Sequence, residues 1–244
     1  SLVGSEMCIR DSSMVVAKWY DQSGNSNDAE QTTSTSRPKI YDGTTGVVTE
    51  NGKPATTPQG FGGLVVANLT GMATTNVFEV VNANQSPAVS LDSDSGAGKY
   101  PYLAWNGSTG GYGRGTSVYV DGVAQSWTTR NDAWQAINSN QHSISYLVDT
   151  SDYSGFKLRY GQYNTTYSPI RQETIIYASD QSSNRTGIET NIGLYYDIPL
   201  AGLLDENPGA AAAYSLRRLS STYTGSAVQV QRADNVGGTT AVSY

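Results

Sequence analysis

Cysteine and histidine are almost missing from this sequence. Among 244 residues there is one Cys, Cys8, and one His, His142. Disulfide frameworks need paired cysteines, and structural zinc sites take most of their ligands from Cys and His. Both are therefore excluded, and a catalytic triad would have to rely on His142. His142 precedes a predicted strand, and we expect it to be a solvated or hydrogen-bonded surface residue.

Charged residues and long apolar runs are also scarce. No stretch approaches the roughly 18 apolar residues of a membrane-spanning helix, so we expect no membrane insertion. Charged residues make up 15% of the chain, against roughly 25% in an ordinary globular domain. The net charge is −6 and Lys and Arg are scattered, so the sequence lacks the basic surface that would bind nucleic acid. The composition also excludes helical bundles and coiled coils.

Glycine and tyrosine are abundant instead, at 26 and 17 residues. Short apolar stretches alternate with clusters of Gly, Asn, Asp, Ser and Thr, a pattern typical of strands joined by turns. Asp121-Gly122 has the composition of a two-residue hairpin turn. The pattern predicts an all-β fold, a jelly-roll sandwich of two antiparallel sheets. Its predicted strands are 15–19, 63–69, 77–82, 101–105, 117–120, 123–127, 143–148, 156–160 and 173–178.

One short helix is expected to close the sandwich. Capping residues occur at 182–184, and apolar residues then recur at helical spacing. These are Ile188, Ile192, Tyr195 and Tyr196. Beyond them, 201–209 has linker composition, a second helix start follows at Asn207-Pro208, and 227–232 alternates as a strand.

The first 13 residues differ in origin from the rest by our interpretation. Met7–Ser12 reads as the translation of a transposase adapter used in preparing sequencing libraries, and Leu2–Glu6 continues it upstream. The alternative is a native N-terminal strand. We exclude residues 1–13, with Cys8, from the fold, and expect the domain at 14–200 to lack its first strand.

Three stretches resemble concanavalin-A-like (laminin-G-like) jelly-roll domains of bacterial secreted proteins and tailed-phage structural proteins. The first, Trp19–Asp28, continues through Gln31, 37–43 and 50–54; the others are 173–192 and 210–232. The first and third also resemble the catalytic domain of α-L-arabinofuranosidase B. The resemblance implies a two-sheet lectin/glucanase fold in an extracellular or virion-surface protein such as a phage tail component.

The order of these stretches differs from that of the families they resemble, where the segment like 210–232 comes first. Two arrangements explain this. In the tandem arrangement, which we favour, 14–200 is one domain, 201–209 a linker, and 210–244 the opening helix and strand of a second copy. In the permuted arrangement, that strand completes the first domain. A sandwich lacking one strand has an open edge, and we expect 210–232 to dock there.

The densest polar stretch holds Asp21, Asn25 and Asp28. Such side chains hold tight loops through hydrogen bonds to the backbone, and they are also oxygen ligands of Ca²⁺. Both interpretations stay open. Asp92 and Asp94 form a second acidic stretch, expected to be a solvated loop and a weaker calcium candidate. No other cofactor is expected.

Four aromatic residues fall in or beside predicted loops rich in Gly and Asn. Aromatic rings stack against the C–H faces of sugars, while amides and carboxylates bond to the hydroxyls. Packing in the core is the alternative. The predicted carbohydrate-binding residues are Trp105, Tyr112, Trp127, Trp134, Asp21 and Asn25.

A glycoside hydrolase would need two carboxylates flanking the substrate. The arabinofuranosidase resemblance implies a nucleophilic Glu in a Val-Asp-x-Glu context, but the nearest match, Val120–Val123, has Val in that place, and the family's paired cysteines are absent. The sequence therefore favours a non-catalytic carbohydrate-binding or adhesive module whose partners are glycans and neighbouring copies. The alternatives are a retaining hydrolase of the α-L-arabinofuranosidase B type and a structural spacer. Candidate carboxylates for the hydrolase are Glu79, Asp121, Asp149, Glu173 and Asp180.

Overall fold

The computed structural model describes residues 13–59, 63–67, 69, 71–93, 99–159 and 169–201. The chain divides into two compact units, Ser1–Leu200 and Ala201–Tyr244. The adapter-like residues 1–12, the linker after Ala201 and the predicted second copy at 210–244 lie outside the described residues. The predicted docking of 210–232 therefore lies outside them too.

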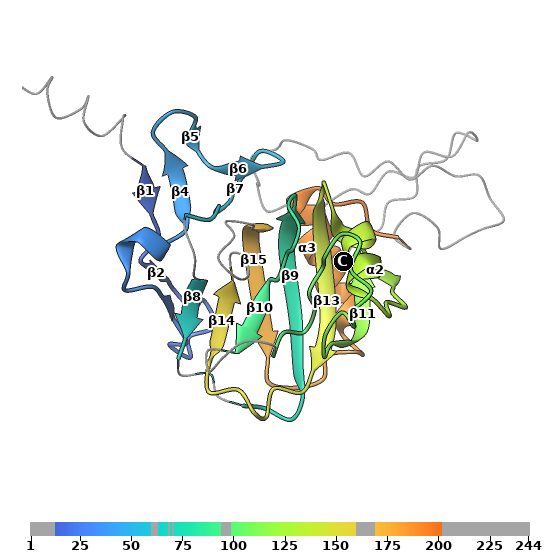
Figure 1. The fold of residues 1–244 in the computed structure, drawn as a ribbon. Coiled ribbons are helices and arrows are strands. Elements are labelled where there is room, and N and C mark those ends of the chain that lie inside the picture. The colour runs from blue at the N-terminus through green and yellow to red at the C-terminus, as the bar shows by residue number, and fades with distance from the viewer. Residues whose placement is uncertain are drawn as a thin grey trace, which may run out of the picture. The chain divides into compact units, whose positions relative to one another are not determined.

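Two five-stranded sheets form the body of the first unit (Figure 1). Every ladder between neighbouring strands is antiparallel. This confirms the all-β sandwich, while its jelly-roll connectivity stays a prediction. The first sheet has the order β10 (Leu91–Ser93), β14 (Phe156–Arg159), β8 (Gly63–Val66), β3 (Ala29–Glu30) and β2 (Lys18–Trp19). The second has the order β12 (Val123–Ala124), β11 (Thr116–Val120), β13 (Gln141–Val148), β9 (Thr75–Ala83) and β15 (Pro169–Tyr177).

Two small sheets and a short helix lie between β3 and β8 in the sequence, with β1 joining one of the sheets. One sheet has the order β1 (Met14–Val15), β4 (Lys39–Asp42) and β5 (Gly46–Val47). The other is the hairpin of β6 (Thr49–Glu50) and β7 (Lys53–Pro54), and the 3-10 helix η1 covers Ser34–Ser36.

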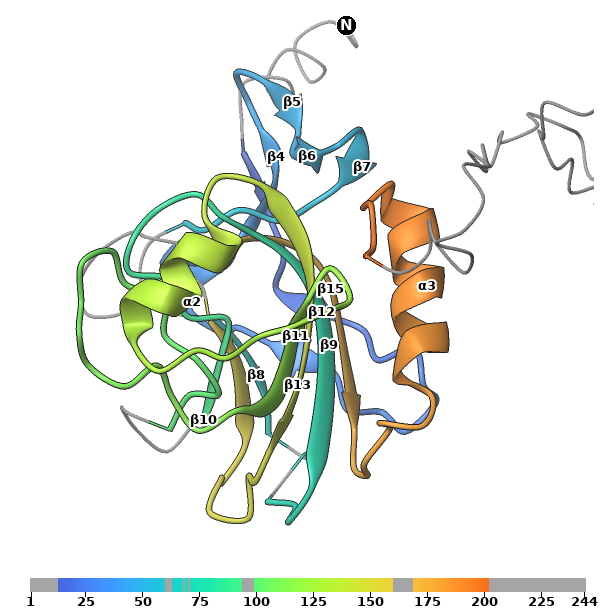
Figure 2. The same cartoon turned by 90° about the vertical axis from the view of Figure 1, so that its right-hand side faces the viewer.

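Strand β9 is buried on both faces. Successive side chains of a strand point in opposite directions, so they enter two different apolar clusters. Val77 and Val81 belong to the core between the two sheets, which also holds Leu64 and Phe156 of the opposite sheet. Phe78 and Val80 belong to a second apolar cluster with helix α3 (Arg185–Tyr196). Figure 2 shows α3 along the outer face of the sheet that holds β9 and β15. This helix is the predicted closing helix, although Tyr195 is 59% exposed and not part of its buried face.

A second helix, α2 (Arg130–Ile137), was not predicted. Thr129 and Asp132 form a capping box at its start, in which each side chain bonds the other residue's backbone. Thr-x-x-Asp is a helix-start pattern, so this signal was present in the sequence. Ala133 and Ile137 anchor α2 to the core. Neither α2 nor α3, the α-helices of the described ranges, is long and apolar enough to cross a membrane.

The predicted hairpin turn at Asp121-Gly122 is confirmed, whereas one predicted strand is not. Asp121 and Gly122 have φ values of 49° and 79°, as a tight hairpin turn requires, and they join β11 to β12. The predicted strand at 101–105 is wrong. Its one β-type pairing among the described residues is an isolated bridge between Ala104 and Ala88.

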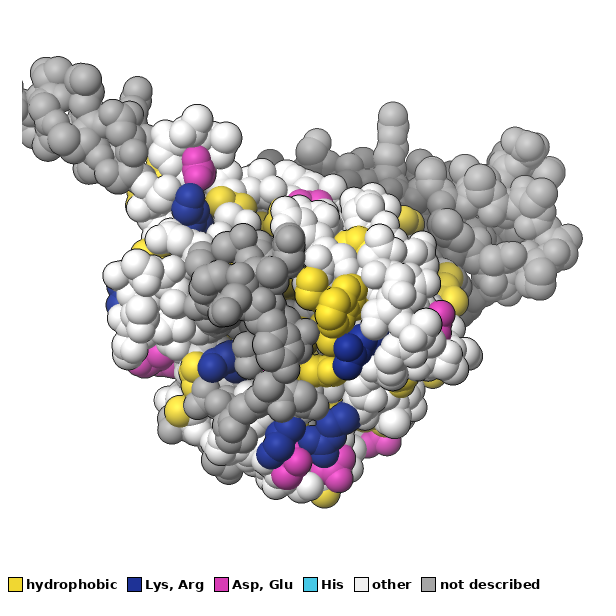
Figure 3. All heavy atoms as spheres, in the orientation of Figure 1, with side chains coloured by type: hydrophobic (Ala, Val, Ile, Leu, Met, Phe, Trp, Pro, Cys, Tyr) yellow, Lys and Arg dark blue, Asp and Glu magenta, His cyan; other side chains and the backbone are white. Residues whose placement is uncertain are grey.

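The surface carries few charges. Figure 3 shows one face, on which hydrophobic side chains are exposed near the middle and charged side chains of both signs gather at the lower edge.

Candidate functional site

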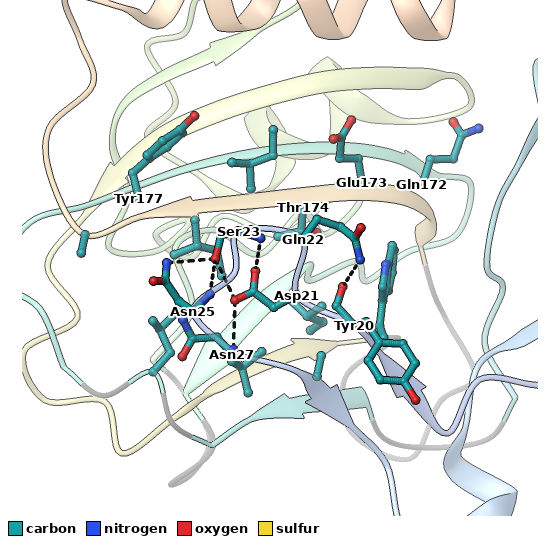
Figure 4. Close-up of a pocket in the computed structure, with 18 of the residues that line it drawn as sticks. Tyr20, Asp21, Gln22, Ser23, Asn25, Asn27, Gln172, Glu173, Thr174 and Tyr177 are labelled. Atoms are coloured by element: carbon teal, nitrogen blue, oxygen red, sulfur yellow. Dashed lines mark hydrogen bonds between the residues drawn. The ribbon is translucent and has the colours of Figure 1, made fainter.

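A cleft of about 640 Å³ lies between β15 and the loop that follows β2. Figure 4 shows this loop below β15, with α3 on the strand's other side. Both β2 and β15 are end strands of their sheets, so the cleft opens along the edge of the sandwich. Its floor is made of buried apolar side chains of the other sheet, namely Ala29, Val66 and Leu158.

The loop wall of the cleft contains Asp21 and Asn25, two of the predicted site residues. The Asp21 carboxylate accepts hydrogen bonds from the Ser23 backbone N–H (2.8 Å), the Ser23 hydroxyl (2.8 Å) and the Asn27 backbone N–H (2.9 Å). These bonds, above all those from the backbone of Asn27 and Ser23, lower the pKa of Asp21, because they favour the ionised form. The Asn25 side-chain amide donates to the Ser23 hydroxyl at 3.0 Å.

Asp28 fastens the other end of the same loop. Its Oδ1 accepts from the backbone N–H of Asp21 at 2.9 Å, and its Oδ2 lies 3.3 Å from Lys18 Nζ. Lys18 also contacts Glu30 at 2.5 Å. The two carboxylates of the loop thus bind its own backbone, and they fix the shape of the cleft wall.

The structure bears on the calcium interpretation in three ways. Both Asp21 oxygens already accept bonds from the loop. Asp92 is not in a solvated loop, as expected, but lies in β10 at 2% exposure, where its carboxylate accepts from the Ser93 N–H at 2.8 Å. Asp94 lies outside the described residues. Within the ranges that are described, no three Asp, Glu, His or Cys side chains gather into a metal-binding group.

The opposite wall of the cleft is β15, whose side chains alternate between its two faces, except at the register shift between Arg171 and Glu173. In Figure 4, Gln172, Glu173 and Tyr177 lie on the side of the strand that faces α3, and Thr174 lies on the side of the loop. Burial raises the pKa of Glu173, partly offset by a hydrogen bond with Tyr196. Asp21 and Glu173 both border the cleft, but they lie on opposite sides of the strand.

Aromatic surface is available at the mouth of the cleft. Tyr20 is 64% exposed, and Trp19 is half-buried beside it. The Gln22 side-chain amide donates to the Tyr20 carbonyl at 3.0 Å, and this bond links Gln22 to Tyr20. Sequence reasoning did not single out Tyr20, Gln22 or Thr174. Tyr20 is next to the polar stretch that the sequence analysis selected. Thr174 reaches the cleft only because β15 lies beside that loop in the folded structure.

The four predicted aromatic residues do not form one exposed platform. Trp127 is 8% exposed and packs edge-on against Tyr102 and Tyr112, with ring centroids 5.9 and 5.7 Å apart. Tyr112 and Trp134 are partly buried against the core, and only Trp105, at 42%, is exposed. None of the four lines the cleft.

The candidate catalytic carboxylates are also dispersed. Glu79 is fully buried and lies 3.3 Å from Arg171, also fully buried. Asp121 accepts from the Ser143 N–H at 2.9 Å and contacts His142 Nδ1 at 2.7 Å. Asp149 and Asp180 each accept from the backbone two residues on, at Ser151 and Ser182. Every one of these groups has a structural partner, and apart from Glu173 none borders the cleft.

A scan against protein-family models found no match for this chain, and searches of the curated proteins and of the solved structures found none either. The resemblance to concanavalin-A-like domains stays a prediction from the sequence.

Proposed function

We propose that the first unit of this chain is a non-catalytic carbohydrate-binding module, and that neutral glycans bind in the cleft beside β15. The observation that supports this most directly is the combination of an exposed Tyr20 ring with uncharged amide and hydroxyl groups on one rigid loop. Sugar rings stack on aromatic faces, and their hydroxyls need many weak, neutral hydrogen-bond partners.

Each part of the cleft has a role in this proposal. Tyr20 offers its ring to the C–H face of a sugar, and the side chains of Gln22, Asn25 and Thr174 offer bonds to hydroxyls. The bonds of Asp21 and Asp28 hold the loop in place, so little conformational entropy is lost on binding. One such cleft binds weakly, and repetition of the module in an extracellular or virion-surface protein would supply avidity.

The hydrolase alternative finds less support in this geometry. A retaining glycosidase needs two carboxylates about 5–5.5 Å apart on either side of the scissile bond. Asp21 is committed to its loop, and Glu173 lies across β15 from it. The spacer alternative would require a surface without a binding cleft, and the cleft of about 640 Å³ argues against it.

Binding can be tested by affinity electrophoresis of the full chain in gels that contain arabinan, arabinoxylan, galactan or β-glucan. We expect retardation in at least one polysaccharide, and about a tenfold loss of affinity in Tyr20→Ala, because a stacking ring is worth roughly a factor of ten. Tyr195→Ala is the matched control: Tyr195 is similarly exposed, at 59%, but does not line the cleft.

Two outcomes would overturn the proposal. One is the absence of retardation in every polysaccharide, and the other is equal retardation of wild type and Tyr20→Ala. Release of the aryl group from an aryl α-L-arabinofuranoside would show instead that the chain is a hydrolase.

A further inference from the structure

Trp105 is an exposed indole on a fixed backbone. The backbone N–H of Trp105 donates to the Arg130 carbonyl at 2.9 Å, and the backbone carbonyl of Trp105 accepts from the Ser108 N–H at 3.1 Å. The indole is nevertheless 42% exposed. An aromatic ring exposed on a fixed backbone is available to stack against a ligand.

The Arg130 guanidinium lies beside this ring, with its Cζ 5.8 Å from the ring centroid. Two hydrogen bonds fix its orientation: Nε donates to the Gly111 carbonyl at 3.2 Å, and Nη2 donates to the Tyr100 hydroxyl at 3.0 Å. Tyr100 is itself 8% exposed. The guanidinium is therefore held in place by the protein, whereas most surface arginines sample many rotamers.

The charge of Arg130 is not neutralised by an ion pair with any described residue. The nearest acid in sequence, Asp132, accepts bonds from the backbone of Thr128 and Thr129 and from the Thr128 hydroxyl. Its carboxylate is thus engaged by the helix cap. In the part of the chain that the structure describes, Nη1 of Arg130 forms no hydrogen bond, so its protons are free for an incoming acceptor.

Space and further polar groups adjoin this pair. A side chain at Gly111 would meet no atom within 4 Å, so a ligand can come close to the backbone there. Asn106 is exposed, and Asn131 is half-buried. The Asn131 side-chain oxygen accepts from the Gly107 N–H at 2.8 Å, which fixes the amide at the rim of the same surface.

We propose that Trp105 and Arg130 form a second binding site, for the carboxylate-bearing sugar of an acidic polysaccharide. The sugar ring stacks on the Trp105 indole, and its carboxylate accepts from Nη1 of Arg130. Arginine suits this role because a charge-assisted bond to a carboxylate is stronger than one between neutral groups. The sugar class rests on the proposed function, but the site shares no residue with the cleft.

The test is a calorimetric titration of the full chain with trigalacturonate, and with its methyl ester, which has the same ring without the charge. We expect binding of the acid only, and a loss of about tenfold or more in both Arg130→Gln and Trp105→Ala. Arg114→Gln is the matched control. Arg114 is another surface arginine, paired with Asp152 at 3.0 Å, and its loss should leave the affinity unchanged.

Tyr20→Ala separates this site from the cleft, because it should keep its affinity for trigalacturonate. If trigalacturonate binds and neutral polysaccharides do not, the cleft proposal is overturned and the proposal of the second site is not. This second site is overturned by an absence of binding, by equal binding of the methyl ester, by unchanged affinity in Trp105→Ala, or by loss of binding in Tyr20→Ala.

Discussion

Glu79 and Arg171 form a fully buried ion pair. The Glu79 carboxylate lies 3.3 Å from Arg171 Nη1 and accepts from the Tyr102 hydroxyl at 2.8 Å and from the Ser90 hydroxyl. Arg171 Nη2 in turn donates to the Ser90 carbonyl at 2.6 Å. Burial and the nearby Glu79 charge raise the pKa of Tyr102, which keeps this phenol protonated as a donor. The polar network joins the neighbouring strands β9 and β15 to Tyr102 and to Ser90, which directly precedes β10 of the opposite sheet.

Glu79→Gln should destabilise the fold by about 3–5 kcal/mol, because it leaves a buried guanidinium without its counter-charge. The free energy of unfolding in urea measures the change. Asp152→Asn, which removes a partly exposed partner of Arg114 and Lys99, should leave the unfolding midpoint unchanged. An unchanged midpoint in Glu79→Gln would mean that the pair contributes nothing.

The stability of the fold depends on pH in part through Asp132. Backbone hydrogen bonds from Thr128 and Thr129 lower its pKa from 3.8 to about 2 in the folded protein. Folding therefore favours the ionised form of Asp132. The stability that this carboxylate adds to the fold is fully present above its pKa in the unfolded chain, and it is lost as the pH falls through its pKa in the folded protein.

The melting temperatures of Asp132→Asn and wild type should therefore differ most at neutral pH. The difference should shrink between about pH 4 and pH 2. Thermal unfolding over this range measures it, and other carboxylates cancel because both proteins share them. A difference that stays constant with pH would contradict the assigned cause.

At the level of elements, the same residue type has opposite roles in β8 and α3. A Cβ on Gly63 would lie 2.2 Å from the Leu158 carbonyl oxygen of the paired strand β14, whereas a Cβ on Gly187 in α3 would meet nothing within 4 Å. Gly63 thus permits the close approach of two backbones. Gly187 only adds conformational entropy to the unfolded chain.

Gly187→Ala should stabilise the protein by about 0.5–1 kcal/mol. Gly63→Ala should destabilise it, since β8 and β14 must separate to admit the methyl group. Both effects can be read from unfolding midpoints in urea. A shift of the same sign in the two variants would show that backbone entropy and backbone contact are not what distinguish them.

At the level of the whole molecule, the two proposed sites differ in charge. The cleft offers uncharged groups to the ligand, and the Trp105–Arg130 site offers a cation. Raising NaCl from about 0.05 M to about 0.5 M shortens the distance over which charges act. Calorimetry should then show weaker binding of trigalacturonate, and electrophoresis should show unchanged retardation by neutral polysaccharides. Equal salt sensitivity would mean that both ligands use the same contacts.

Much of the fold was predictable because it depends on local pattern. The period-two alternation of 77–81, the Asp121-Gly122 turn and the helical spacing after Asn184 each encode an element in neighbouring residues. The stretch 101–105 misled because its first four residues are buried without being in a strand. The capping pattern of α2, Thr129-x-x-Asp132, is present in the sequence, but the residues around it have few apolar side chains.

The site was less predictable, because a ring's exposure depends on what packs against it. The sequence by itself determined an all-β sandwich, and it marked the stretch of Asp21 and Asn25 as dense in polar groups. Only the tertiary structure decided that Asp21 binds its own loop, that Thr174 faces that loop, and that Trp127 is buried while Trp105 is exposed. The packing of one sheet against the other brings Asp21 and Thr174, which are far apart in the sequence, into one cleft, and no local pattern carries that information.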